Sequence, residues 1–128
     1  MSSDFEKAIE AFNCGEYFDA AEAFEGLSSA EGELKELVGA LNRVAAGLHM
    51  RFERGGRRAT INLLSQALLI LDELKPERGG IDVELFFDQI SAYTEQIRAT
   101  PKDEHDGIKH RARLFLERRR APKIPRKR

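Results

Sequence analysis

Residues 12–27 read FNCGEYFDAAEAFEGL, and this stretch decides how the chain begins to fold. Gly15 divides it, because glycine can take the positive φ that ends a helix without a Cβ clash. On both sides of Gly15 the apolar residues recur every three or four positions, which is the spacing of one helical face. The stretch therefore predicts two helices, at about residues 4–13 and 16–27, with the aromatic side chains around Gly15 closing them into a hairpin. The aromatic residues of the stretch are Phe12, Tyr17, Phe18 and Phe24.

Helical spacing continues through the rest of the chain, while the sustained alternation of apolar and polar residues that indicates strands is absent. Further helices are expected at about residues 30–53, 58–75 and 82–99, the last of them capped by Asp82. The helix at 58–75 has apolar residues on nearly every face, which predicts a central position. The fold class that follows is all-α: an antiparallel bundle of about five helices, followed by a C-terminal basic helix and tail.

The C-terminal region differs in charge from the rest of the chain. Residues 109–128 contain ten Lys or Arg and one acid, a balance of +9, which leaves −10 for the remainder of a chain with net charge −1. We expect three parts: a helical bundle domain at 1–99, an appended amphipathic basic helix at 100–120, and a disordered basic tail at 121–128. Such asymmetry predicts either an acidic partner for the tail or a tail that folds back on its own acidic body.

Composition narrows the class of protein. The 128 residues are 41% hydrophobic and 34% charged, which is typical of a single helical domain, and no apolar run is long enough for a membrane span. The single cysteine, Cys14, cannot form an intrachain disulfide, and we expect a buried thiol in a reducing compartment. These features predict a cytoplasmic protein that does not contact a membrane.

One set of polar residues is expected to border a groove on the second and third helices: Tyr17, Glu22, Glu25, Asn42 and His49. Carboxylates and imidazoles on facing helices are how metal sites are built in bundles. A metal-assisted hydrolase-like site at Glu22, Glu25 and His49 is therefore one alternative, and a solvated acidic face is the other. Because no Glu-x-x-His pair and no complete catalytic set is present, we expect no catalytic residue, no metal and no cofactor.

A second set consists of cations that are candidates for anion binding. Some precede the N-terminus of the helix at 58–75, where backbone N–H groups favour anions, and the others lie in the C-terminal region. Phe115 is the aromatic residue there that offers base stacking, so nucleic-acid binding through the tail would be nonspecific. The candidates are Arg54, Arg57, Arg58, Arg118, Arg119, Arg120, Lys123, Arg126, Lys127 and Arg128.

Three pieces of the chain, taken in order, resemble the domain-of-unknown-function family numbered 309, a group of small all-helical bacterial and archaeal proteins. They are residues 12–25 (FNCGEYFDAAEAFE), 39–49 (GALNRVAAGLH) and 54–64 (RGGRRATINLL). The resemblance covers about residues 5–97 and implies a helical fold without implying a reaction.

The family signature is His-x-x-x-Glu-x-x-Trp. Glu25 fills its Glu position, whereas Ala21 stands in place of the His and Ser28 in place of the Trp. Of the family's motif residues, Glu25 and His49 carry over to this chain. A divergent member without the His and the Trp is what the resemblance implies.

The sequence thus favours a non-catalytic helical interaction domain over an enzyme, with a basic tail for an acidic partner that is either protein or nucleic acid. A homodimer stays open, because three aromatic residues exceed what a small core is expected to bury: Phe86, Phe87 and Tyr93.

Overall fold

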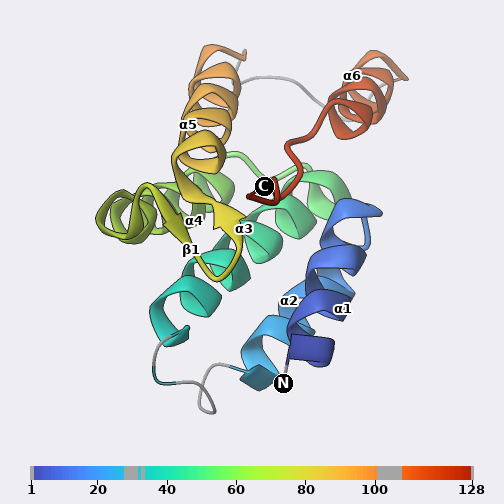
Figure 1. Ribbon diagram of the computed structural model, residues 1–128. Helices are drawn as coiled ribbons and strands as arrows, with labels where there is room; N and C mark the ends of the chain where they lie inside the picture. Colours follow the sequence, from blue (N-terminus) through green and yellow to red (C-terminus); the bar gives the residue numbers. More distant parts are fainter. Residues whose placement is uncertain (1, 28–31, 33, 101–107, 128) are drawn as a thin grey trace.

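The computed structural model describes residues 2–27, 32, 34–100 and 108–127. These residues form an all-α bundle with one very short hairpin, as the helical spacing predicts (Figure 1). In chain order the elements are α1 (Ser2–Asn13), α2 (Tyr17–Leu27), α3 (Lys35–Arg54), α4 (Arg58–Leu74), β1 (Glu77–Arg78), β2 (Ile81–Asp82), α5 (Val83–Ala99) and α6 (Ile108–Arg119).

The helical hairpin of α1 and α2 forms where the sequence predicts it. Gly15 has a φ of +84°, and its N–H donates to the carbonyl of Phe12 at 2.9 Å, which ends α1. The ring of Phe12 then meets the ring of Tyr17 edge to face, with 5.3 Å between their centroids. These aromatic contacts fix the angle at which α2 returns along α1.

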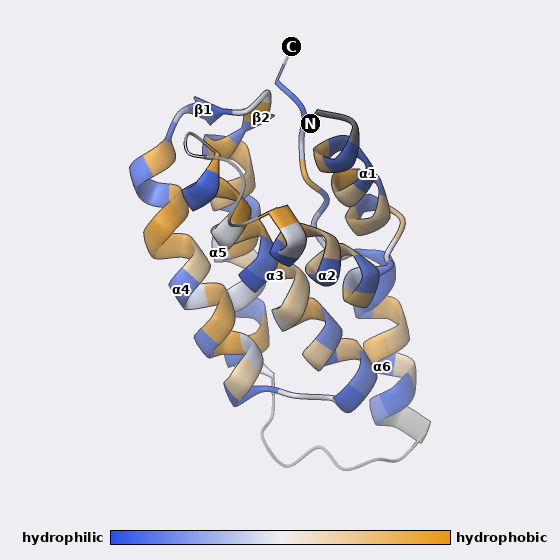
Figure 2. Cartoon of the chain, turned by 90° about the horizontal axis from the view of Figure 1, so that it is seen from below, coloured by the Kyte–Doolittle hydropathy of each residue, from blue (hydrophilic) through white to orange (hydrophobic). Residues whose placement is uncertain are grey.

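The central helix is α3, and the expectation that the helix at 58–75 is central was wrong. Nine residues of α3 are buried, against five of α4, and α3 packs on α2 at one side and α4 at the other. Figure 2 shows α4 at one side of the molecule, with apolar residues along much of its length. Its outer residues Leu69, which is 75% exposed, and Ile70 border a hollow of about 750 Å³ between α3 and α4.

A two-residue turn between β1 and β2 joins α4 to α5. Gly79 and Gly80 both have positive φ, at 59° and 75°, which is the geometry that closes a tight hairpin. No hairpin was predicted here, because the sequence beside the Gly-Gly pair lacks the alternation that indicates strands. The predicted cap of α5 is confirmed, because the Asp82 carboxylate accepts a hydrogen bond from the backbone N–H of Leu85 at 3.0 Å.

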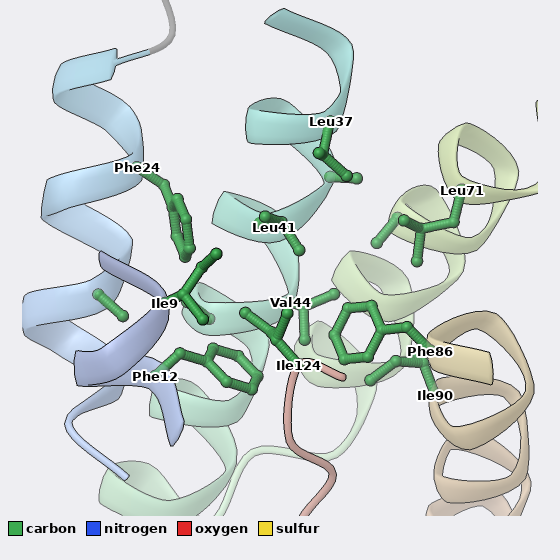
Figure 3. Packing of buried hydrophobic residues seen from close by; sticks show 14 of the residues in the cluster. Ile9, Phe12, Phe24, Leu37, Leu41, Val44, Leu71, Phe86, Ile90 and Ile124 are labelled. Atoms are coloured by element: carbon green, nitrogen blue, oxygen red, sulfur yellow. The ribbon is translucent and has the colours of Figure 1, made fainter. Parts of the chain in front are cut away.

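The expected disordered tail is instead an ordered part of the core. We call residues 120–127 the C-terminal segment; it returns from α6 to the middle of the molecule (Figure 1). Ile124 is only 2% exposed, and Figure 3 shows it among apolar residues of α1 and α5: Ile9, Phe12, Phe86 and Ile90. The segment therefore supplies a core residue from the far end of the chain.

Backbone and side-chain hydrogen bonds hold the C-terminal segment on both sides of Ile124. Asn13 binds the Ile124 backbone twice, accepting from its N–H at 2.7 Å and donating to its carbonyl at 3.3 Å. Next to the hairpin, the N–H of Asp82 donates to Pro125 and the N–H of Lys127 donates to Gly80. The segment thus lies beside β2 as a third extended piece of chain.

Basic side chains of the C-terminal segment bind the chain's own first helix, α1. Arg126 forms two bonds to the Glu6 carboxylate, at 2.9 and 2.7 Å, and Lys123 donates to the carbonyl of Asn13 at 3.2 Å. Of the two sequence-based alternatives, folding back on the acidic body is therefore what the structure shows for residues up to 127. The charge and the prolines of this segment are typical of disorder. The burial of Ile124 and its two hydrogen bonds to Asn13 account for the order.

Three smaller expectations also change or fall outside the described ranges. Cys14 is exposed, not buried, because it follows the last turn of α1. Of the aromatics that suggested a homodimer, Phe86 and Tyr93 are buried and Phe87 is half-buried beneath Lys75 Nζ, which lies 3.7 Å from its ring centroid, and the homodimer stays a prediction. The predicted start of the last helix lies outside the described residues, and α6 begins at Ile108.

In the described part of the chain, no helix has the length and apolar character needed to cross a membrane.

Truncating Ile124 to alanine tests whether the C-terminal segment is part of the core. We expect Ile124→Ala to lower the free energy of unfolding by about 2–4 kcal/mol, because it removes buried methylene groups and leaves a cavity. The matched control is Leu69→Ala, which trims an exposed side chain and should change stability by less than about 0.5 kcal/mol. Urea denaturation measures both, and equally small losses would contradict the packed segment.

Candidate functional site

A buried ion pair attaches α6 to the bundle. Glu117, on α6, is 8% exposed, and its carboxylate accepts two bonds from the Arg51 guanidinium of α3, at 2.8 and 3.0 Å. The hydroxyl of Tyr93, on α5, donates to the same carboxylate at 2.5 Å. Arg51 also donates to the carbonyl of Gly56 at 3.2 Å. Three helices therefore meet at one carboxylate, and we call these residues, Arg51, Tyr93 and Glu117, the buried triad.

The pKa values of the triad follow from burial and from Glu117. Burial raises the pKa of Tyr93 well above that of a free tyrosine, and the hydrogen bond to Glu117 and its negative charge raise it further. For Arg51, burial alone would lower the pKa, but the hydrogen bonds and charge of Glu117 outweigh it and raise the pKa of the guanidinium. The native triad thus consists of a neutral phenol and a charged guanidinium bound to one carboxylate.

Sequence reasoning missed the triad, although two signals were present. Arg51 falls three residues after Leu48 and seven after Val44, so it lies on the buried face of a helix where a cation needs a partner. Glu117 is the one acid among residues 109–128. An acid within a basic run and a cation on an apolar face are complementary, but only the fold shows that they meet.

Docking of α6 creates a positively charged groove against α5. Two hollows of about 570 and 320 Å³ share Gln96 and Arg120 in their linings, and we call them together the α5–α6 groove. Lys123 and Arg119 line the first hollow, and Arg113 lines the second. The acid in the lining is Glu117, whose charge the Arg51 guanidinium already balances. Among the described residues, the groove therefore presents three cations besides Arg113, which interacts within the chain.

The opposite side of α6 borders a second hollow, with aromatic walls. This hollow of about 350 Å³, the aromatic hollow, is lined by the start of α2, the end of α3 and one arginine of α6. Its aromatic and basic lining residues are Tyr17, Phe18, His49, Phe52 and Arg118. The rings of Tyr17 and Phe52 lie 5.8 Å apart, and those of Phe18 and His49 lie 5.2 Å apart.

The structure brings together part of the predicted groove set. Tyr17 and His49 both line the aromatic hollow, whereas the other three residues do not. Asn42 instead ties α3 to α2 by donating to the carbonyl of Ala21 at 2.8 Å. Glu22 and Glu25 lie on the exposed side of α2.

The metal-assisted alternative requires a cluster of His, Cys, Asp or Glu side chains that could hold a metal ion. Across residues 2–27, 32, 34–100 and 108–127, no three His, Cys, Asp or Glu side chains lie close enough together to hold a metal ion.

The predicted anion-binding cations are distributed over several surfaces. Arg54 and Arg58 are exposed at the turn between α3 and α4, and Arg57 there donates to the carbonyl of Arg98 at 2.7 Å. Lys127 is exposed at the end of the C-terminal segment, and Arg126 is paired with Glu6 as described.

Four of these cations lie near α6, and they divide between its two sides. Arg119, Arg120 and Lys123 line the α5–α6 groove, while Arg118 lines the aromatic hollow. Arg128 lies outside the described residues.

Comparison with family models, with curated proteins and with solved structures finds no match for this chain. The resemblance to family 309 therefore stays a prediction that rests on the three quoted pieces of sequence.

The raised pKa of Tyr93 predicts how stability depends on pH. An unfolded tyrosine ionises near pH 10, whereas the native phenol keeps its proton. Above pH 10 the unfolded state therefore binds fewer protons than the native state. The contribution of each such tyrosine to the free energy of unfolding is constant below pH 10, and above pH 10 it falls by up to about 1.4 kcal/mol per pH unit. Tyr93→Phe should flatten this alkaline decline, measured by urea denaturation from pH 7 to 11.

Tyr17 is the matched control for this effect, since burial also raises its pKa but no hydrogen bond joins its hydroxyl to another described residue. Both single Tyr→Phe variants should flatten the alkaline decline. At pH 7 only Tyr93→Phe should lose stability, by about 1.5–3 kcal/mol for a hydrogen bond to a charged acceptor. Equal stabilities of the two variants at pH 7 would contradict the role given to Tyr93.

Proposed function

We propose that this protein is a non-catalytic helical binding domain whose α5–α6 groove receives an acidic peptide segment of a partner protein. The observation that carries the proposal is the convergence of Arg119, Arg120 and Lys123 on one groove, where the acid of the described lining is already neutralised. In a chain of net charge −1 this local excess is large. Carboxylates are the groups that such a surface attracts and orients.

The buried triad holds in place the helix that presents cations to the groove. Glu117 precedes Arg119 and Arg120 by two and three residues, so the same helical turn that holds the carboxylate also presents the cations. The chain then turns into the C-terminal segment, which Asn13 and Ile124 fix in place. Cations held on a fixed frame lose less conformational freedom when they bind a ligand.

Amide groups in the groove favour a peptide over a nucleic acid. The Oε1 atom of Gln89 is shielded from solvent without a hydrogen-bond partner in the described structure, and a backbone N–H of a bound peptide would supply the missing donor. Base stacking would need an accessible aromatic face, but the aromatic residue of the lining is Tyr93, which is buried. We therefore favour an acidic peptide, and a single-stranded oligonucleotide is the comparison in the test.

Fluorescence polarisation with a labelled hexaglutamate peptide tests the proposal. We expect binding that weakens with salt, and a loss of affinity in the double variant Arg119→Gln/Arg120→Gln. Two exposed charge contacts contribute about 1–2 kcal/mol together, which corresponds to a roughly five- to thirtyfold loss. Both side chains are exposed, so the variant should fold as the wild type does.

The matched control is Arg54→Gln/Arg58→Gln, which removes the same charge from the turn between α3 and α4 and should leave the affinity nearly unchanged. An equal loss in both double variants would mean diffuse attraction and would contradict the groove. Tighter binding of a single-stranded oligonucleotide than of hexaglutamate at the same salt concentration would replace the peptide by nucleic acid.

A further inference from the structure

The aromatic hollow has one wall, Phe18, that burial does not explain. Phe18, in the first turn of α2, is 52% exposed, and its ring lies beside the imidazole of His49. Tyr17 and Phe52 form the facing wall, with their ring planes tilted by 31°. Packing in the bundle accounts for Tyr17 and Phe52, whereas the exposed ring of Phe18 borders an open hollow of about 350 Å³. Aromatic faces carry negative potential, so such walls attract cations.

Carboxylates at the rim of the hollow point to the same kind of ligand. Glu16, Asp19 and Glu53 belong to the lining and are exposed. The lining contains one permanently charged cation, Arg118. Without that arginine the hollow would combine three acids with three aromatic rings. This charge preference is opposite to that of the α5–α6 groove.

The chain's own Arg118 shows how the walls receive a guanidinium. Its guanidinium carbon lies 5.6 Å from the ring centroid of Tyr17 and 5.7 Å from that of Phe52, within the range of cation–π contact. One of its nitrogens donates to the carbonyl of Gly15 at 2.8 Å, and another lies 3.5 Å from the Glu53 carboxylate. Planar stacking on rings together with N–H donation to oxygen is characteristic of arginine.

Tyr17 supplies an observation that does not depend on charge. The side chain is 5% exposed and lines the hollow, yet its hydroxyl makes no hydrogen bond to another described residue. Its oxygen is not shielded from solvent, so the N–H groups of an incoming guanidinium can reach it and donate to it.

We infer that the aromatic hollow is a second binding site, which takes an arginine side chain of a basic partner segment beside Arg118. The incoming guanidinium stacks on the exposed ring of Phe18, beside the rings that Arg118 covers, and the carboxylates at the rim balance its charge. This site lies on the other side of α6 from the α5–α6 groove and uses different residues. It therefore stands or falls independently of the acidic-peptide proposal.

Titration of the full-length protein with a triarginine peptide, followed by two-dimensional ¹H–¹⁵N NMR, tests the inference. The largest shifts should fall on the amides of residues 15–19 and 49–53. Phe18→Ala should weaken binding about two- to fivefold, because it removes one aromatic wall at an exposed site. Trilysine should bind more weakly than triarginine, since an ammonium lacks the planar stacking surface of a guanidinium.

Charge is tested by two matched double variants. Asp19→Asn/Glu53→Gln removes two carboxylates from the rim of the hollow and should weaken triarginine binding severalfold. Glu36→Gln/Glu73→Gln removes two carboxylates from the hollow between α3 and α4 and should leave it unchanged. Equal losses in the two variants, or no loss in Phe18→Ala, would overturn the site in favour of diffuse attraction to an acidic surface. Equal affinities for trilysine and triarginine would overturn the assignment to arginine.

Discussion

The ion pair between Arg51 and Glu117 is the contact on which the C-terminal half of this structure depends. Arg51 lies on the buried face of α3, and a buried guanidinium without a partner is costly enough that the chain must supply an anion. Glu117 supplies it through two parallel hydrogen bonds, and Tyr93 donates to the same carboxylate. Such a pair adds little net stability over an apolar core, but it admits one position and one rotation of α6. We therefore regard the buried triad as the device that sets where α6 docks.

Fixing the rotation of α6 also divides its arginines between two sites. Successive residues on a helix point in directions about 100° apart, so three consecutive arginines after Glu117 cannot share one surface. Arg118 is directed to the aromatic hollow, and Arg119 and Arg120 to the α5–α6 groove. The C-terminal segment then continues into the core, which keeps both sites from separating. A basic run that looks uniform in the sequence thus contributes to two surfaces of opposite charge preference.

Much of the fold was predictable from local chemistry, and the errors concern contacts between distant residues. Gly15 and Asp82 act locally, one through its allowed φ and the other through a helix cap, so their roles could be read from the sequence. The spacing of apolar residues likewise located the helices along the chain. It did not predict which helix is central, because α4 has apolar residues on faces that it does not bury. Of the candidate sites, Tyr17 and His49 do share a hollow, whereas Asn42 is used to join two helices.

The central claim is that Glu117 sets the docking of α6, and amide hydrogen exchange in a Glu117→Gln variant tests it most directly. The substitution keeps the shape of the side chain and removes the charge that Arg51 needs. The account predicts that protection from exchange falls by about two orders of magnitude at the amides of α6 and of residues 120–127, because breaking a buried ion pair costs about 3–5 kcal/mol. The amides of α1 to α4 should stay protected. Unchanged protection in α6, or an equal loss in every helix, would contradict it.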